Sequence, residues 1–171
     1  MSPPLDPGQI PPSVAFLLSR LGYDASREMS QALAGLSLEL RQFGLLRLLA
    51  SAQGGSQRAL GAMLDITPNR MVALVDGLES KGLIERRPHP EDRRAYTISL
   101  TDAGAAAFGQ AMQAAFGVEA TMCESLAPQE RAQLLALLQK LAVARNERSG
   151  AVPGVHPGML ERDDQPPQQH T

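Results

Sequence analysis

The stretch from residue 56 to residue 101 restricts the fold of this chain more than any other part of it. Its first half holds two short segments with apolar residues at helical spacing, separated by a short break. Ser56 can cap the first segment, and Thr67 followed by Pro68 is a typical start for the second. Gly82 should end the second segment, as glycine often does at the C-terminus of a helix. The pattern predicts a helix, a tight turn and a helix.

A short β-hairpin should follow these helices. Residues 83–87 and 95–100 have the composition of strands, and the proline-rich segment 88–92 between them cannot continue a ladder and should be the loop. Arg93 and Arg94 then lie at the tip of the hairpin. Two helices joined by a tight turn can place the second in a DNA major groove, and a cationic hairpin can reach the neighbouring backbone or minor groove. The residues therefore predict a DNA-binding regulator.

Several motifs of this stretch resemble those of the MarR family of winged helix-turn-helix regulators. The matching pieces are LVDGLESKGLIERR at 74–87, DRR at 92–94 and SLTDAG at 99–104, while QFGLLRLLA at 42–50 is similar to the family's second helix. The resemblance covers about residues 12–145. It implies a mainly α fold, a winged helix-turn-helix with a small β-hairpin wing, and N- and C-terminal helices that form a dimerisation region.

The chain divides into regions on this basis. Residues 1–11 are proline-rich and are expected to be disordered, and residues 146–171 are expected to form a flexible tail. Residues 37–100 should form the DNA-binding lobe. Residues 12–36 and 101–145 should form dimerisation helices, because their broad apolar faces need burial against a second copy, with packing inside one chain as the alternative.

Individual helix boundaries follow from caps and breaks. Gly22 is a possible weak point in the first helix, and a second helix is expected over residues 37–52. Thr101 should cap a long helix that ends near Leu126, and Pro128 should begin the last helix.

The start of the second short helix holds the residues best suited to reading bases. Arg70 can bind guanine through two hydrogen bonds, and Asn69 can do the same with adenine. By resemblance, Arg94 completes the wing's Asp-x-Arg element, while Asp92 supports an arginine of the wing without touching DNA. A role as a helix cap or a solvated surface residue stays open for these side chains. The expected DNA contacts are Ser56, Gln57, Thr67, Pro68, Asn69, Arg70, Arg86, Arg93 and Arg94.

Net charge places a condition on DNA binding. The chain carries a formal charge of −2, and residues 56–94 hold seven basic side chains against six acidic ones. DNA binding must therefore depend on a local surface and not on an overall positive charge, and it should be sensitive to salt. A symmetric dimer would present two recognition helices about one turn of DNA apart, ~34 Å, and so predicts a pseudo-palindromic site.

The resemblance also implies an effector. Relatives in the family often bind anionic or aromatic ligands between the dimer helices and the winged lobe. Arg20, Tyr23, Arg27 and Arg41 are the candidates by location, and an arginine there can pair with a carboxylate.

Other functional classes find little support. No nucleophile frame, phosphate-binding glycine loop or metal-ligand spacing occurs, so the sequence predicts no enzyme, no metal and no cofactor. No run of 18 apolar residues or signal peptide is present, and a single cysteine suits the reducing cytoplasm. Two alternatives remain: a winged-helix interaction module without DNA binding, and a redox switch through Cys123, for which a buried inert thiol is the favoured interpretation.

Overall fold

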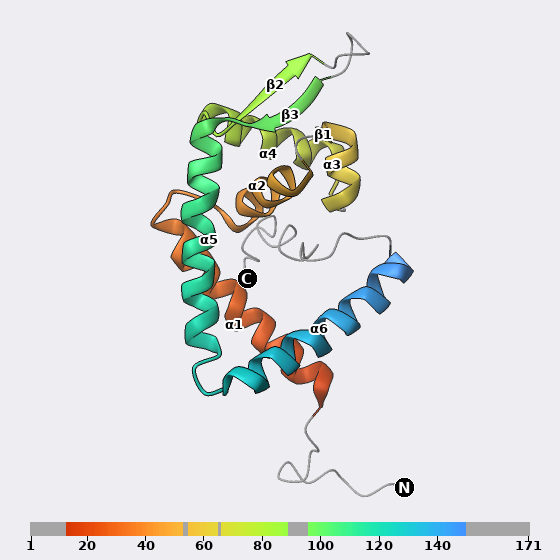
Figure 1. The fold of residues 1–171 in the computed structure, drawn as a ribbon. Helices are drawn as coiled ribbons and strands as arrows, with labels where there is room; N and C mark the ends of the chain where they lie inside the picture. The colour runs from red at the N-terminus through yellow and green to blue at the C-terminus, as the bar shows by residue number, and fades with distance from the viewer. Residues whose placement is uncertain (1–12, 53–54, 65, 89–95, 150–171) are drawn as a thin grey trace, which may run out of the picture.

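The computed structural model describes residues 13–52, 55–64, 66–88 and 96–149. Within these residues the chain is mainly helical with a small antiparallel sheet, as predicted (Figure 1). The elements are α1 (Val14–Ala34), α2 (Leu40–Ala52), β1 (Gly55–Ser56), α3 (Gln57–Leu64), α4 (Pro68–Ser80), β2 (Ile84–Pro88), β3 (Tyr96–Leu100), α5 (Asp102–Met122) and α6 (Pro128–Ser149).

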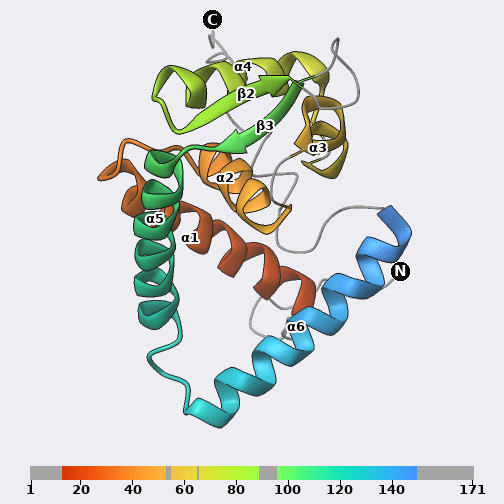
Figure 2. The same ribbon diagram turned by 45° about the horizontal axis from the view of Figure 1, so that its top comes forward.

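The elements form two regions. Helices α2, α3 and α4 pack with the sheet into one compact unit, which lies at the top of Figure 1 and is called the lobe below. Helix α5 runs down from the lobe and packs against both α1 and α2. Helix α6 turns back after the end of α5, and Figures 1 and 2 both show it apart from the lobe. Helices α1, α5 and α6 are called the arm.

The sheet is larger than the predicted hairpin. Its strand order is β1-β3-β2, and β3 runs antiparallel to both neighbours. The sequence does not predict β1, in which Gly55 pairs with Ile98, because two residues carry no alternating pattern. The expectation that Pro88 lies in the loop is wrong, since it is the last residue of β2 and pairs with Tyr96. Proline is tolerated there because β2 is an edge strand.

The core fills the space between α2, α4, the sheet and α5. Helix α2 supplies much of it, with Leu45 and Leu46 fully buried. Phe43 stacks on Phe108 of α5 with ring centroids 6.1 Å apart, which joins the lobe to the arm. The other core residues are Leu33, Leu38, Leu48, Leu49, Leu60, Leu64, Met71, Leu74, Val75, Leu78, Ile84, Ile98 and Ala111.

Gly82, two residues after the last residue of α4, terminates this helix as predicted. Gly82 has a φ of +68°, its N–H donates to the carbonyl oxygen of Glu79 at 2.8 Å, and the N–H of Leu83 donates to that of Leu78 at 3.1 Å. These two bonds form a Schellman motif, which pairs carbonyls that a helix end leaves without partners. The turn leads directly into β2, so it sets the direction of the β2–β3 hairpin, the wing, relative to α4.

A second Schellman motif forms the corner between α1 and α2. Ser37 has a φ of +54°, an uncommon value outside glycine. The N–H of Ser37 donates to the carbonyl oxygen of Ala34 at 3.0 Å. The N–H of Leu38 donates to the carbonyl oxygen of Leu33 at 3.1 Å. Leu33 and Leu38 are both buried, which is the apolar contact expected with this motif. The corner moves the start of the second helix from the predicted residue 37 to Leu40.

The long helices agree with the sequence in position and differ at their ends. Helix α1 continues through Gly22 without a break. Helix α6 begins at Pro128 as predicted and continues to Ser149, past the expected boundary at residue 145. Helix α5 ends at Met122, earlier than the predicted end near Leu126.

Helix α5 begins in close contact with the turn after α4. Thr101 caps it as predicted: its Oγ1 accepts from the N–H of Gly104 at 3.0 Å and donates to the carbonyl oxygen of Gly82 at 2.7 Å. A Cβ atom on Gly104 would lie 1.8 Å from the carbonyl oxygen of Leu83. Only glycine fits at this position without moving the backbone.

We expect Gly104→Ala to lower the free energy of unfolding by about 3 kcal/mol, because the obstructing atom belongs to the backbone. Gly109→Ala on the same helix is the matched control, since a Cβ there meets nothing within 4 Å. That control should be neutral or stabilising by up to about 1 kcal/mol. Urea unfolding at one fixed protein concentration measures both variants. Equal stability of the two would contradict the close approach.

Candidate nucleic-acid interface

Helices α3 and α4 form the predicted helix-turn-helix. The N–H of Ile66 donates to the carbonyl oxygen of Gly61 at 3.1 Å and closes the turn after α3. Thr67 occupies the N-cap position of α4 with extended backbone, and Pro68 is the first helical residue, as predicted. The exposed Thr67 side chain makes no capping hydrogen bond within the described residues. Thr67 therefore begins α4 by its position and extended backbone, without a capping hydrogen bond from its side chain.

Helix α4 has one buried face and one open face. The buried residues are Met71, Leu74, Val75 and Leu78. Asn69, Val72, Ala73 and Asp76 are exposed, and their spacing places them in one stripe along the helix. Arg70 is half-buried beside this stripe. Val72 and Asp76 are not among the predicted DNA contacts, although they follow Asn69 by three and seven residues, the helical spacing that places them on its face.

Arg86 of the wing is engaged by carboxylates of α4. Its guanidinium donates to Asp76 and to Glu79. The pKa of Arg86 is raised above its ordinary value, chiefly by the hydrogen bond to Asp76 and further by the charge of Glu79. The sequence predicts a DNA contact for Arg86, whereas the structure directs its donors to these carboxylates. The pairing joins the wing to α4 and offsets negative charge beside the open stripe.

The residues at the start of α3 lie beside α4. The Oγ of Ser56 accepts from the N–H of Ala59 at 3.2 Å, so Ser56 caps α3 as predicted. Gln57 is the first residue of α3 and is half-buried. Gln57 and Arg58 line a cavity of about 560 Å³, whose wall continues over the turn to Pro68.

The base of the wing is described and its tip is not. Arg87 forms an ion pair with Glu85 of the same strand, with 2.5 Å between nitrogen and oxygen. Asp92, Arg93 and Arg94 lie outside the described residues. Their contacts with DNA, and the supporting role of Asp92, therefore stay predictions.

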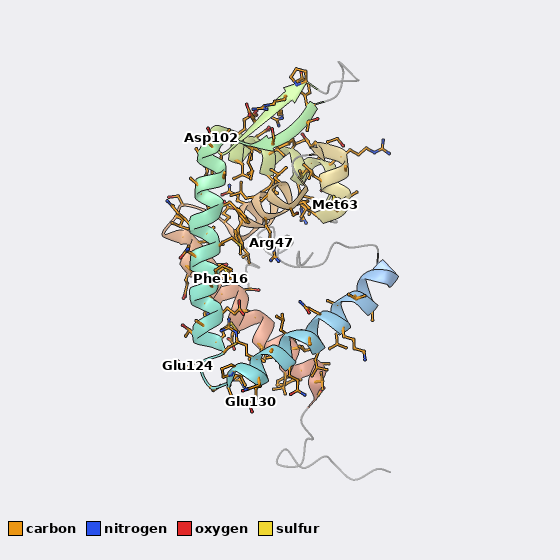
Figure 3. The ribbon with its side chains drawn as sticks, in the orientation of Figure 1. Arg47, Met63, Asp102, Phe116, Glu124 and Glu130 are labelled. Carbon is orange, nitrogen blue, oxygen red and sulfur yellow. The ribbon has the colours of Figure 1, made fainter. Side chains whose placement is uncertain are left out.

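A cavity of about 800 Å³ lies between the lobe and the arm. Its wall is mostly apolar and includes Met29, Met112 and Phe116, while Arg47 and Glu119 add charge. Figure 3 labels Arg47 on α2 and Phe116 on α5. Arg47 is thus an arginine at this cavity that the sequence analysis does not single out.

The four predicted effector residues do not meet at this cavity. The described residues that line it include none of Arg20, Tyr23, Arg27 and Arg41. The wall uses another face of α1, because it takes Leu18, Leu21, Gly22, Ala25 and Met29 at helical spacing. The guanidinium of Arg27 forms an ion pair with the carboxylate of Asp24, with 3.9 Å between nitrogen and oxygen. Arg41 lines a separate cavity of about 360 Å³, which Arg70 of α4 also lines.

The arm exposes an apolar surface. Phe16 is 67% exposed, Phe116 57% and Leu137 54%. Apolar surface of this extent on a single chain marks an interaction site. The other large apolar side chains exposed on the arm are Val14, Leu17, Leu18, Leu21, Tyr23, Leu134, Leu135, Leu138, Leu141 and Val143.

The described residues offer no metal cluster and no membrane-spanning helix. No group of three or more histidine, cysteine, aspartate or glutamate side chains in the described part of the chain could hold a metal ion. No helix there is long and apolar enough to cross a membrane. Cys123 is the C-terminal capping residue of α5, not an interior helix residue as expected, and it is half-buried instead of buried.

Comparisons with known proteins agree with this arrangement. The family model described as "MarR family" matches residues 34–95. The chain is 35% identical over 99 residues to a putative transcriptional regulatory protein for the hcr operon of Thauera aromatica; the match covers 58% of this chain and 60% of that relative, less than two thirds of its length. It is 31% identical to the HTH-type transcriptional repressor Rv2887 of Mycobacterium tuberculosis, with 75% of this chain and 92% of the relative covered.

Solved structures show the same fold. The transcriptional repressor CouR bound to a 23-mer DNA duplex matches with a TM-score of 0.71 and 29% identity, over 82% of this chain and 99% of that one. CouR from Rhodococcus jostii RHA1 bound to p-coumaroyl-CoA matches with a TM-score of 0.63 and 28% identity, over 75% and 91% of the two chains. By its winged helix-turn-helix and by these similarities, the chain belongs to the MarR family of transcriptional regulators.

Proposed function

We propose that this protein is a homodimeric repressor that binds a pseudo-palindromic operator in double-stranded DNA. The observation that carries the proposal is the open stripe of α4, which begins at the N-terminal end of the helix beside the wing. In helix-turn-helix proteins, residues of that end contact base edges in the major groove. The relative CouR has been solved bound to a DNA duplex.

Each part of the interface has a separate task in this proposal. Arg70 and Asn69 read bases, and Val72 can contact a thymine methyl group. Thr67 and Pro68 bring the helix start to the groove, and the exposed Thr67 hydroxyl can donate to DNA. Ser56 and Gln57 lie near the phosphate backbone at the start of α3, and Arg93 and Arg94 at the wing tip enter the minor groove with support from Asp92.

Arg86 has a different task from the one the sequence predicts. A phosphate contact would compete with its hydrogen bonds to Asp76 and Glu79. We assign to Arg86 the role of holding the wing against α4 and of reducing the repulsion between these carboxylates and DNA. Arg86 then acts on affinity through position and charge, without touching a base.

The arm supports the homodimer. Its exposed apolar side chains lie on α1, α5 and α6, which would otherwise stay in water. A second copy can cover them with the same residues across a two-fold axis, and this arrangement also presents two α4 helices to one operator. Packing inside one chain, the alternative, does not account for α6, whose described side chains are all exposed.

The cavity between lobe and arm is the proposed effector site. It touches both regions, so a ligand there can favour one relative placement of arm and lobe and thereby release DNA. Its apolar wall and Arg47 suit an anionic ligand with an apolar body. The relative CouR has been solved with p-coumaroyl-CoA, which has both features. Arg20, Tyr23, Arg27 and Arg41 would act from outside this wall.

We propose that the chain regulates transcription in the cytoplasm, where an operator would be bound, and catalyses no reaction. A redox switch through Cys123 has no support from a second thiol, since the chain holds one cysteine. The remaining alternative is a winged-helix interaction module that does not bind DNA, and an experiment can distinguish it from the repressor.

We expect the purified protein to bind DNA from its own upstream region far more tightly than scrambled DNA, with affinity that falls steeply with salt. Arg94→Ala should weaken binding to all sequences, while Arg70→Ala should also relax base preference, at a cost of about 1–3 kcal/mol each. Fluorescence anisotropy across a salt series measures these effects. Weak, equal binding to both DNAs would favour the interaction module, and unchanged affinity in both variants would refute the contact map.

Replacing Arg86 with Met should reduce operator affinity by about tenfold, because two carboxylates then face DNA without compensation. Adding Asp76→Asn and Glu79→Gln to Arg86→Met should restore most of the loss. A direct phosphate contact by Arg86 predicts instead that Arg86→Met costs the same tenfold when it is added to Asp76→Asn and Glu79→Gln as it does in the wild type. The same anisotropy assay distinguishes the two results.

Leu141→Glu should shift the protein from dimer to monomer, because a charge on the apolar face of α6 has no partner when buried. Light scattering measures the mass, and the operator assay should show a parallel loss of affinity. Ala136→Glu, which adds the same charge to the same helix and removes only a methyl group, is the control for added charge. A Leu141→Glu dimer with full affinity would remove α6 from the interface.

A further inference from the structure

Lys81 links the recognition helix to the corner of the arm. It is the C-terminal capping residue of α4, and its Nζ donates to the carbonyl oxygen of Ser37 and to Oε1 of Gln42, both at 2.7 Å. Ser37 lies in the turn that ends α1, and Gln42 lies in the first turn of α2. One side chain therefore joins the ends of three helices.

Gln42 gives this link a fixed anchor. It is a buried polar residue, 6% exposed, and its Oε1 also accepts from the N–H of Glu39 at 3.2 Å. A Cβ atom on Gly77 of α4 would lie 3.4 Å from Nε2 of Gln42, so α4 approaches the amide closely. A buried amide with two donors on its oxygen has little freedom to turn, and loss of either donor is costly.

The second acceptor is equally fixed. Ser37 is held in the left-handed conformation by the Schellman bonds of the corner. Carbonyl groups at the C-terminal end of a helix carry partial negative charge, which an ammonium group stabilises. Lys81 thus connects the end of α4 to the corner after α1 through Ser37 and to the start of α2 through Gln42.

Resting on the proposed function, we propose that Lys81 is a positioning residue that sets the tilt of α4 relative to the arm, and thereby the spacing of the two recognition helices in the dimer. Helix α4 has 13 residues and so is about 20 Å long. A tilt of ~10° about its C-terminal end would move its base-reading end by ~3 Å, close to the 3.4 Å rise of one base pair. A small change at Lys81 can therefore alter which half-site spacing fits.

The test uses the full-length protein and operators whose half-site spacing is changed by one base pair in either direction, together with DNA that carries one half-site. Lys81→Met should lose about tenfold in affinity for the native spacing and flatten or shift the spacing preference, as expected for a lost hydrogen bond to a charged group. Its single half-site affinity and its salt slope should match the wild type. Lys81→Arg should restore the preference, because it keeps the charge and the donors.

Two further variants keep the result interpretable. Lys140→Met removes the other lysine of the chain, on α6, and should leave the spacing preference unchanged. Gln42→Met removes one acceptor without changing the charge of Lys81 and should also flatten the spacing preference. Its result decides the case if Lys81→Met does not fold.

Three results would overturn the proposal. An unchanged spacing preference in Lys81→Met and Gln42→Met would remove the positioning role. A parallel loss on all DNAs, with a salt slope reduced by about one, would make Lys81 a phosphate contact. Absence of operator binding by the wild type would refute the proposed function and this inference with it, whereas wild-type binding with unaltered variants refutes the inference alone.

Discussion

The first turn of α5 meets the turn after α4 at a contact between two stretches of backbone. Gly104 lies against the carbonyl oxygen of Leu83, and the hydroxyl of Thr101 bonds both the first turn of α5 and the carbonyl of Gly82. The recognition helix α4 ends, the wing begins and α5 begins next to this contact. Each would change direction if a side chain separated the two stretches, so the whole interface depends on one glycine and one threonine.

Charge on the DNA-facing side is balanced locally. The chain has a net charge of −2, and α4 itself carries Asp76 in its open stripe and Glu79 beside it. Arg86 compensates both from the wing, which ties the electrostatic state of the helix to the position of the hairpin. A protein of this kind cannot bind DNA through a general positive field. Its affinity must come from shape and from a few arginines, which favours selective over non-specific binding.

The sequence predicts the fold well wherever a cap, a glycine or a helical period specifies an end. Thr67, Pro68, Gly82 and Thr101 all occupy the positions expected from their chemistry. It fails where tertiary contacts decide, as in the two-residue strand β1, whose pairing partner lies more than 40 residues away. It also fails at Ser37, because a left-handed serine at a helix end has no local signature like that of glycine.

For a related reason, the sequence does not show which group each arginine of the site contacts. An arginine can bind DNA, bind a ligand or pair with a carboxylate of its own chain, and only the fold shows which of these contacts it makes. The pattern predicts a DNA contact for Arg86, whereas its position as the third residue of β2 brings it against the carboxylates of α4. The effector candidates of α1 share a helix with the cavity wall but occupy other faces of it, whereas Arg47 reaches the cavity from α2.

The lobe and the arm are joined at separate places with different physical character. Phe43 and Phe108 stack near the cavity, where contacts are apolar and can be rearranged by a ligand at modest cost. At the corner, the bond from Lys81 to the carbonyl of Ser37 is polar and directional, and the second bond of Lys81, to the buried amide of Gln42 within the lobe, anchors it. A ligand that separates the apolar contacts would thus leave the polar contact as the pivot. Rotation of the lobe about that pivot is the simplest motion that changes the spacing of two recognition helices without unfolding either lobe.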